Sequence, residues 1–238
     1  MLPAAGLGQT RSDPEQTPRA GARRSRGVVT KLLLVSDEVS PALERALPRE
    51  GFRDVDLILS CGDLPYDYLE YLMDAFDVPL LYVHGNHDRP VEGERRQITA
   101  PQGGTRVEGR VVEAKGLLIA GLGGSPRYAP RYEHQYTEWE MRRRVRRLGR
   151  RLWWVERRRG KRLDLFFTHA PPRGIHDQTD PAHRGFQSLR SFLDRHRPRY
   201  HIHGHSYPRP GLPNRTRYGA TEVIHVRGHT ILEVPDHG

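Results

Sequence analysis

The sequence predicts an α/β protein, and three observations support this fold class. Short, nearly continuous apolar runs recur along the chain, as expected of strands that are buried on both faces. Helix-like segments separate the first three runs, and a further amphipathic helix follows in the second half. No internal repeat is present. The predicted strands are residues 31–36, 55–60, 80–84, 117–120, 163–168, 200–203, 223–226 and 230–234, and the predicted helices are 41–47, 66–76 and 185–196.

Local signals justify these elements in order. Ser40 can cap the first helix, and Pro41 suits its first turn because proline has no N–H to lose there. Residues 185–196 place four apolar side chains on one helix face. The last two apolar runs flank Arg227-Gly228, so they are predicted to form a closing hairpin.

An Arg-rich segment, 137–162, adds a further predicted helix. Thr137 and Glu140 form a capping-box pattern, and from Met141 onward apolar residues recur at offsets of 4, 7, 11 and 14. The arginines occupy the other faces. Two interpretations remain open, a solvated surface helix or a docking surface for an anion or nucleic acid.

The three tryptophans in and beside this helix, Trp139, Trp153 and Trp154, are predicted to be packing anchors instead of platforms for stacked bases. The net charge of the chain is +10, but residues 142–162 alone carry +11 and residues 1–27 carry +3. The rest of the chain is therefore mildly acidic, and only the Arg-rich helix suggests contact with nucleic acid.

Composition excludes several classes of protein. With 36% hydrophobic residues, a mean hydropathy of −0.74 and no apolar run of about 18 residues, the chain is not expected to enter a membrane. The single cysteine, Cys61, excludes an intramolecular disulfide framework and fits a reducing compartment. Residues 1–27 lack a signal-peptide core and are predicted to be a disordered basic leader. We therefore expect a cytoplasmic protein with a single domain over residues 28–238.

Residues with metal-ligand chemistry follow the apolar runs. In α/β sheets the ends of parallel strands meet at one edge, so residues distant in sequence can come together there. One such residue is usually a turn or cap residue, whereas five groups in order predict a binding site. The groups are Asp37 after the first run, Gly62 and Asp63 after the second, Gly85 to Asp88 after the third, Thr168 and His169 after a later one, and Gly204 and His205 after the last.

At these residues the chain resembles the calcineurin-like metallophosphoesterase family, from about Lys31 to about Tyr207. The best match is LYVHGNHD at 81–88, supported by LSCGDLPYDYLEYL at 59–72 and THAPPRGIHD at 168–177. The resemblance implies an αββα sandwich, with two central mixed sheets flanked by helices, that holds two metal ions.

The resemblance also implies residue roles. His87 would donate a proton to the leaving oxygen, and Asp88 would steady His87. Asp63 would bridge the two ions. The implied metal ligands are Asp37 and Asp63 at the first site, and Asp63, Asn86, His169 and His205 at the second.

The donor types fit divalent metals. Two ions about 3.5 to 4 Å apart can hold a hydroxide in line with phosphorus and neutralise the phosphoryl charge. Nitrogen and oxygen ligands without thiolate suit Mn, Fe, Zn, Ni or Mg, and we favour Mn with one or two ions per chain.

Two positions depart from the family pattern. Val39 stands where the family's Asp-x-His motif has its histidine, and Tyr207 stands where Gly-His-x-His has its last one. Val39 cannot bind a metal, and Tyr207 binds one only if the metal ionises its phenol, whose ordinary pKa is about 10. Both departures affect the first metal site.

Three interpretations remain open. The protein holds one firm ion and one loose, water-rich ion; or other residues fill the gap; or hydrolysis is lost and the fold binds a phosphate ligand. The candidate replacements are Glu38, His176, His183 and His203, for which outward-facing or hydrogen-bonding roles are the alternative. His201, His203 and His205 alternate along a predicted strand and so should share a side, with His201 packed inside.

From these features we predict a metal-dependent phosphoesterase that uses hydroxide attack without a covalent intermediate. A phosphodiester is favoured over a phosphomonoester because a general acid helps most with a poor alkoxide leaving group. The expected partner is a phosphate-ester small molecule or a nucleotide. The alternative is a catalytically impaired module that binds a nucleotide or, through the Arg-rich helix, nucleic acid. Oligomeric state is not predicted.

Overall fold

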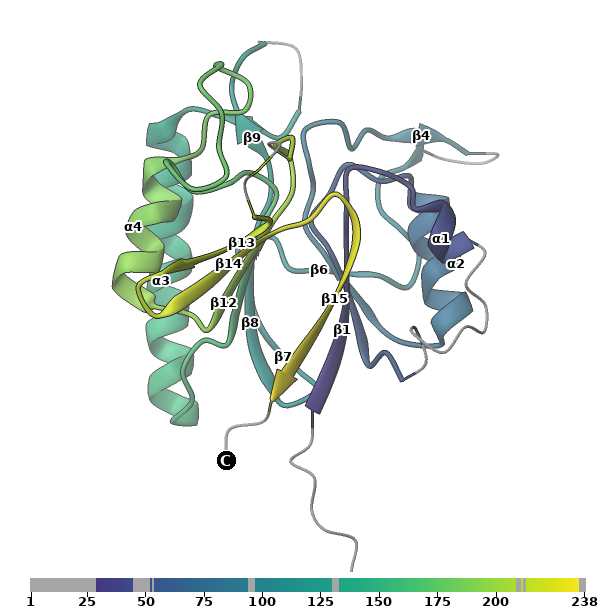
Figure 1. The fold of residues 1–238 in the computed structure, drawn as a ribbon, viewed down its shortest axis with the longest axis horizontal. Helices are drawn as coiled ribbons and strands as arrows, with labels where there is room; N and C mark the ends of the chain where they lie inside the picture. The colour runs from purple at the N-terminus through teal and green to yellow at the C-terminus, as the bar shows by residue number, and fades with distance from the viewer. Residues whose placement is uncertain are drawn as a thin grey trace, which may run out of the picture.

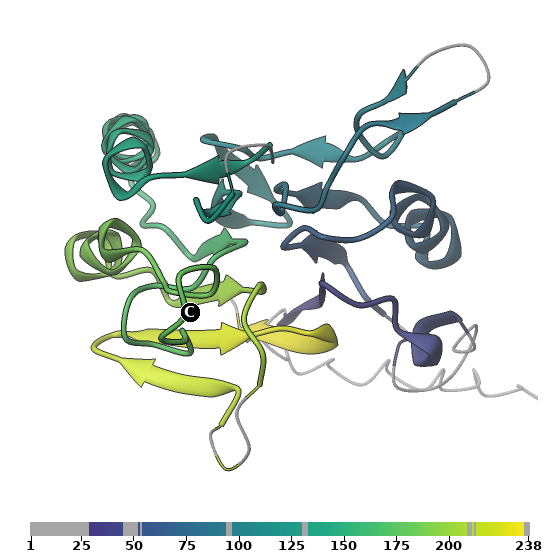
Figure 2. The ribbon, with the colours of Figure 1, turned by 90° about the horizontal axis from the view of Figure 1, so that it is seen from above.

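The computed structural model describes residues 29–44, 52, 54–93, 97–129, 133–208, 211 and 213–235. Two β-sheets lie face to face, and helices cover the outer face of each (Figures 1 and 2). This arrangement confirms the predicted αββα sandwich with two mixed sheets. The predicted leader lies outside the described residues, as do residues 45–47 of the first predicted helix.

The elements follow the predicted order, with added short strands. The first sheet contains β1 (Val29–Ser36), β2 (Leu57–Ser60), β3 (Leu80–Tyr82), β6 (Thr105–Arg106) and β15 (Gly228–Pro235). The second contains β7 (Val111–Ala114), β8 (Leu117–Leu122), β11 (Leu165–Thr168), β12 (Tyr200–His203), β13 (Arg215–Tyr218) and β14 (Thr221–His225). The helices are α1 (Pro41–Glu44), α2 (Tyr66–Phe76), α3 (Glu138–Arg159) and α4 (Gln187–His196), and small ladders pair β4 (Val91–Glu92) with β5 (Gln97–Ile98) and β9 (Ser125–Pro126) with β10 (Gln135–Tyr136).

Strand order explains why one edge can form a site. The sheets run β15-β1-β2-β3-β6 and β13-β14-β12-β11-β8-β7. Within them β1, β2, β3 and β6 are parallel, as are β8, β11, β12 and β14. The carboxyl ends of both parallel sets lie at the upper edge in Figure 1.

The continuous apolar runs arise because both faces of each sheet are buried. In β1, Leu32 and Leu34 point into the core between the sheets, whereas Leu33 packs with the layer that includes α2. In β11, Phe167 joins the core between the sheets and Phe166 packs under α3 and α4. Alternate residues of one run therefore fill two different cores.

The helices of the second sheet begin side by side. Thr137 caps α3 in the capping box that the sequence predicts, with Glu140 as its partner. The α4 helix has no cap from its own N-cap side chain. Instead Glu138 of α3 accepts hydrogen bonds from the N–H groups of Gln187 and Ser188, at 2.9 and 2.8 Å. This carboxylate accepts hydrogen bonds from backbone donors at the start of α4, and its negative charge interacts favourably with the helix dipole.

The predicted closing hairpin is wrong. The strands β14 and β15 lie in different sheets, and the chain crosses between them at Arg227-Gly228. β15 instead pairs with β1 along eight residues and covers the edge of the first sheet. The hairpin in this region joins β13 to β14, and the sequence analysis missed β13. Both β14 and β15 carry residues for the core between the sheets, so apolar pattern alone could not separate the two arrangements.

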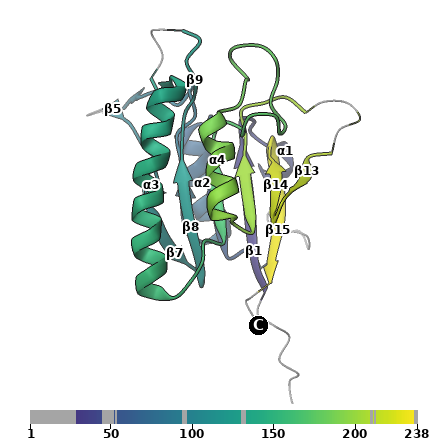
Figure 3. The ribbon, with the colours of Figure 1, turned by 90° about the vertical axis from the view of Figure 1, so that its left-hand side faces the viewer.

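The predicted anchoring role of the tryptophans is also wrong. Trp139, Trp153 and Trp154 are 60%, 50% and 60% exposed. α3 has 22 residues, or about 33 Å, whereas α4 has 10 residues, or about 15 Å. Since the two helices start together, the second half of α3 extends past the end of α4 (Figure 3). Of the helices that the structure describes, none therefore packs against the part of α3 that carries Trp153. Among the described residues, no helix combines the length and apolar character needed to cross a bilayer.

Candidate metal centre

The predicted ligands come together at the carboxyl ends of the parallel strands. Asp37 follows β1, Asp63 lies in the loop after β2, and Asn86 lies in the loop after β3. From the second sheet, His169 follows β11 and His205 lies in the loop after β12. Both sheets thus contribute to one site, as the strand-end argument predicts.

His169 is the central contact of the group. It is fully buried, and its Nε2 lies 3.0 Å from Asn86 Oδ1 and 3.3 Å from Asp63 Oδ2. Its other nitrogen, Nδ1, lies 2.8 Å from the carbonyl oxygen of Cys61 and donates to it. This hydrogen bond fixes the ring and leaves Nε2 directed at the polar group, as in metal-binding histidines.

His205 is held in a matching way. Its backbone N–H donates to both carboxylate oxygens of Asp37, at 3.1 and 3.0 Å. Its Nε2 lies 2.7 Å from the carbonyl oxygen of Ala182 and donates to it, which leaves Nδ1 as the free ligand atom. The rings of His169 and His205 are 4.8 Å apart.

Glycines allow these loops to approach each other. A Cβ on Gly85 would overlap the carboxylate of Asp63, and a Cβ on Gly204 would overlap Ser36 and Asp37. Close approach therefore explains the glycine that precedes Asn86 and the one that precedes His205.

Three candidate ligands have left-handed backbone conformations. The φ angles of Asp37, Asp63 and His205 are 63°, 58° and 67°. For residues other than glycine this region is unfavourable, and such conformations concentrate at functional sites. These backbone conformations set the directions in which the three side chains leave their loops.

The electrostatics favour a cation. Burial alone would raise the pKa of Asp63, but His169 lowers it to about 2. Burial alone would lower the pKa of His169, but the carboxylates of Asp63 and Asp37 raise it to about 9. His169 is therefore protonated at neutral pH, and its surroundings favour positive charge.

The pKa values of the other two titratable predicted ligands are shifted in opposite directions. Burial raises the pKa of Asp37, and the neighbouring charge of Asp63 adds to that effect. Burial lowers the pKa of His205 to about 3, and His169 adds to the effect, so His205 is neutral as a metal ligand must be.

The donor set fits a divalent ion. One ligand atom from each of Asp63, His169 and His205 lies within 4.8 Å of the others. Asn86 adds an amide oxygen against His169. Carboxylate, imidazole and amide donors without thiolate suit borderline or hard divalent metals.

The two residues of the predicted acid pair, His87 and Asp88, differ in exposure. His87 is exposed, and its backbone N–H donates to Asp63 Oδ1 at 2.7 Å. Asp88 is buried, and its carboxylate accepts the N–H of Gly85 at 2.8 Å. Burial raises the pKa of Asp88 to about 6, and the charge of Asp63 adds to that effect. Asp88 thus shapes the loop that carries His87.

The altered positions and the candidate replacements beside them are exposed or half-buried. Glu38 accepts a hydrogen bond from Arg227 at 2.9 Å and is exposed. Val39 and Tyr207 are 37% and 50% exposed, and the guanidinium of Arg227 lies 4.5 Å from the Tyr207 ring. His183 pairs with Asp180 at 2.8 Å, with its ring 5.1 Å from that of His205.

The structure does not bring His176 and His203 to Asp63. His176 Nδ1 lies 3.0 Å from His203 Nε2, and His176 Nε2 lies 2.8 Å from Thr216 Oγ1. The His203 ring stacks on that of His225 at 5.1 Å. These side chains form a second histidine group, with His201 fully buried beside His203.

Sequence analysis missed Tyr128. Its hydroxyl accepts a hydrogen bond from Asn86 Nδ2 at 3.1 Å, which orients the amide oxygen toward His169. Tyr128 lies shortly after β9, at the same edge as the predicted ligands. That position is the one sequence feature that points to it. The carbonyl groups of Cys61 and Ala182 were equally invisible, because backbone acceptors leave no mark in a sequence.

Comparisons with known proteins identify a family and a fold. The sequence model of the family described as calcineurin-like phosphoesterase matches residues 34–209. One solved structure, 15% identical, has a TM-score of 0.60 and covers 87% of this chain and 95% of its own. The protein TT1561 of Thermus thermophilus, 19% identical, has a TM-score of 0.56 and covers 83% and 89%. At these identities the likeness shows the fold alone. No curated protein sequence matches.

Proposed function

The chain belongs to the calcineurin-like phosphoesterase family, and from this premise we propose that it is a metal-dependent phosphodiesterase. The observation that carries the proposal is the convergence of Asp63, His169 and His205, whose ligand atoms lie within 4.8 Å of one another. Their carboxylate and imidazole donors fit the divalent metals that the family binds.

We assign the firm ion to Asp63, Asn86, His169 and His205. A second, loosely held ion would take Asp37 together with Asp63. A divalent ion bound there supplies positive charge to the phosphoryl oxygens and makes a bound water more acidic. Mn is the favoured metal, because it accepts oxygen and nitrogen ligands and tolerates water ligands.

The chain's own residues would position substrate and move a proton. His87 is exposed at the rim, and its N–H bond to Asp63 ties its backbone to the ligand group. We assign it as the general acid that protonates the leaving oxygen from its imidazole. That role favours a phosphodiester, because an alkoxide is a poor leaving group without a proton.

The test is hydrolysis of bis-p-nitrophenyl phosphate by metal-stripped protein resupplied with Mn²⁺. Asp63→Asn is expected to lower turnover at least about a hundredfold, because a neutral amide holds the ion less well. Asp74→Asn, on the exposed side of α2, is the matched control and should keep full turnover. Equal turnover by the Asp63 variant, or turnover that persists in EDTA, would contradict the proposal.

A second candidate is a phosphate-ligand binder without hydrolysis, favoured by the exposed Val39 and Tyr207 beside the group. Folded protein that binds one Mn²⁺ and a nucleotide, yet shows no turnover of either phosphodiesters or phosphomonoesters, would support this candidate over the hydrolase.

A further inference from the structure

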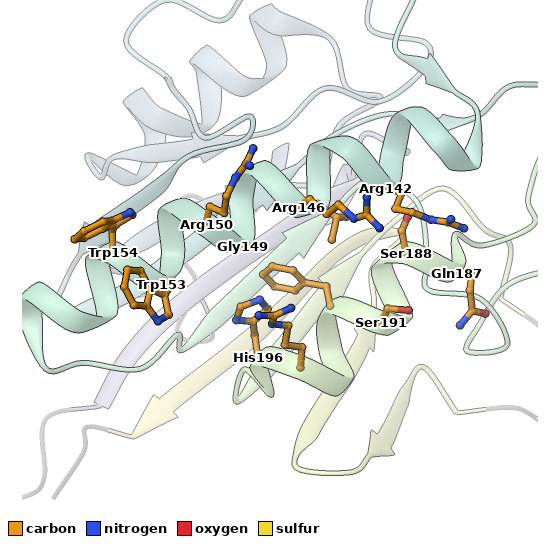
Figure 4. A pocket seen from close by; sticks show the side chains of 13 residues that line it. Arg142, Arg146, Gly149, Arg150, Trp153, Trp154, Gln187, Ser188, Ser191 and His196 are labelled. Carbon is orange, nitrogen blue, oxygen red and sulfur yellow. The ribbon is translucent and has the colours of Figure 1, made fainter.

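A groove of about 950 Å³ lies between α3 and α4, on the outer face of the second sheet (Figure 4). Figure 4 shows Arg142 and Arg146 beside Ser188 and Ser191, and Trp153 near His196 toward the other end. The metal centre lies instead at the strand ends between the sheets. The groove is therefore a separate feature of the molecule.

Helix length and one glycine shape the groove. A Cβ on Gly149 would come within 3.1 Å of His196 Nε2, so glycine lets the last turn of α4 lie close against α3. Beyond that point no helix of the described segments lies beside α3, and Trp153 and Trp154 are 50% and 60% exposed. The groove thus opens onto two large aromatic side chains.

Two sets of arginines on α3 differ in their partners. One set has structural partners: Arg144 pairs with Glu108, Arg159 pairs with Glu113, and Arg151 donates to the carbonyl oxygen of Gly109. These contacts hold α3 to the segments around β7.

The other set, Arg142, Arg146 and Arg150, lines the groove. Within the part of the chain that the structure describes, none of the three forms a side-chain hydrogen bond or ion pair, and no acidic residue lines the groove. Like charges four residues apart destabilise a helix, so this stripe is unfavourable without a ligand. Arg195 of α4 adds a fourth positive charge.

We propose that this groove binds single-stranded nucleic acid, with phosphates on the arginine stripe and bases stacked on Trp153 and Trp154. Sites for single strands combine a basic groove with exposed aromatic rings, because every base has a face that can stack. Guanidinium groups also match phosphate oxygens in a two-pronged geometry. Successive arginines of the stripe are about 6 Å apart along the helix axis, a repeat suited to an extended strand.

Other occupants fit these features less well. A second copy of the chain would place arginines against arginines. A flat anionic membrane cannot enter a groove between two helices. An acidic peptide would satisfy the charges, but only a strand of bases supplies a series of flat rings to stack on the exposed tryptophans.

The test is fluorescence anisotropy with a fluorescein-labelled 20-nucleotide oligothymidine, titrated with the full chain in EDTA at several salt concentrations. EDTA prevents hydrolysis, so failure of this proposal and failure of the hydrolase proposal are distinguishable. Affinity should fall steeply with salt, and tryptophan fluorescence should be quenched on binding.

Two variants of the groove separate charge from stacking. R142Q/R146Q/R150Q should weaken binding at least tenfold and reduce the slope of log affinity against log salt by about 2, as expected for three lost phosphate contacts. W153L/W154L should weaken binding at least about fivefold with little change in slope.

The matched control is R143Q/R147Q/R158Q, which removes the same charge from exposed positions of α3 outside the groove. It should weaken binding less than threefold. Circular dichroism melting checks that each variant folds, and the single charge reversal R146E replaces the triple variant if that one does not. Equal losses in groove and control variants would overturn the proposal. So would unchanged affinity in W153L/W154L, or equally tight binding of polyglutamate, anionic vesicles or a DNA duplex.

Discussion

Two groups of histidines lie at the same end of the second sheet, and their surroundings differ. His169 and His205 lie beside the carboxylates of Asp63 and Asp37. The second group, His176, His201, His203 and His225, lies against other histidines and hydroxyl groups. Burial lowers the pKa of every member of the second group.

The difference shows that carboxylates, and not histidine density, decide which group can hold a cation. In the first group a carboxylate compensates for burial and raises the pKa of His169 to about 9. In the second group no carboxylate is among the hydrogen-bond partners in the described residues, and the rings stay neutral. Sequence spacing cannot separate the groups, because His203 and His205 are two residues apart on one strand end.

The largest expected effect comes from breaking the first group. His169→Gln should lower Mn²⁺ affinity at least about a hundredfold, because it removes the nitrogen that faces both Asp63 and Asn86. Isothermal titration calorimetry measures it. His183→Gln is the control: its ring lies near His205 but pairs with Asp180, so a loss below threefold is expected. A similar loss in both variants would assign His183 to the ion as well.

The next effect concerns the second group and pH. Burial lowers the pKa of His201 to about 3, whereas an unfolded histidine has a pKa of about 6.5. The unfolded chain therefore binds more protons at pH 5, so stability from neutral His201 is lost as pH falls from 6.5 toward 3. His201→Leu should remove on the order of 2 kcal/mol of the stability difference between pH 7 and pH 5.

Urea unfolding of the wild type and His201→Leu in EDTA, at both pH values, measures this difference. Equal pH dependence in the two proteins would show that His201 titrates normally, and the contrast between the two histidine groups would then fail for one of the two fully buried members of the second group.

A third experiment adds histidines beside a carboxylate. V39H/Y207H restores the two imidazoles of the family pattern, which the resemblance assigns to the first metal site together with Asp37. We expect the bound Mn²⁺ to rise from one to two per chain and turnover to rise about tenfold, since a second ion shares the phosphoryl charge. V39Q/Y207Q, polar but without imidazole, should leave both values unchanged. A wild type that already binds two ions firmly would contradict the comparison.

The strand ends were predicted well because each predicted ligand follows a short apolar run that forms a buried strand. It predicted the capping box of α3 for a similarly local reason, a hydrogen bond between Thr137 and Glu140. The predictions of a closing hairpin and of tryptophan anchors were wrong because both features depend on segments that are distant in the sequence. β15 is placed by its pairing with β1, and the exposure of Trp153 follows from the shortness of α4.

Tyr128 is the clearest case of a residue fixed by a distant partner, and it gives the smallest expected effect. Its hydroxyl accepts a hydrogen bond from the Asn86 amide, whose oxygen would hold the ion, so Tyr128→Phe should weaken Mn²⁺ affinity about fivefold, the value of one neutral hydrogen bond. A positioning role predicts that excess Mn²⁺ restores turnover. Tyr136→Phe is the control, since no described residue bonds its hydroxyl. Loss of turnover that saturating Mn²⁺ does not restore would instead place Tyr128 against the substrate.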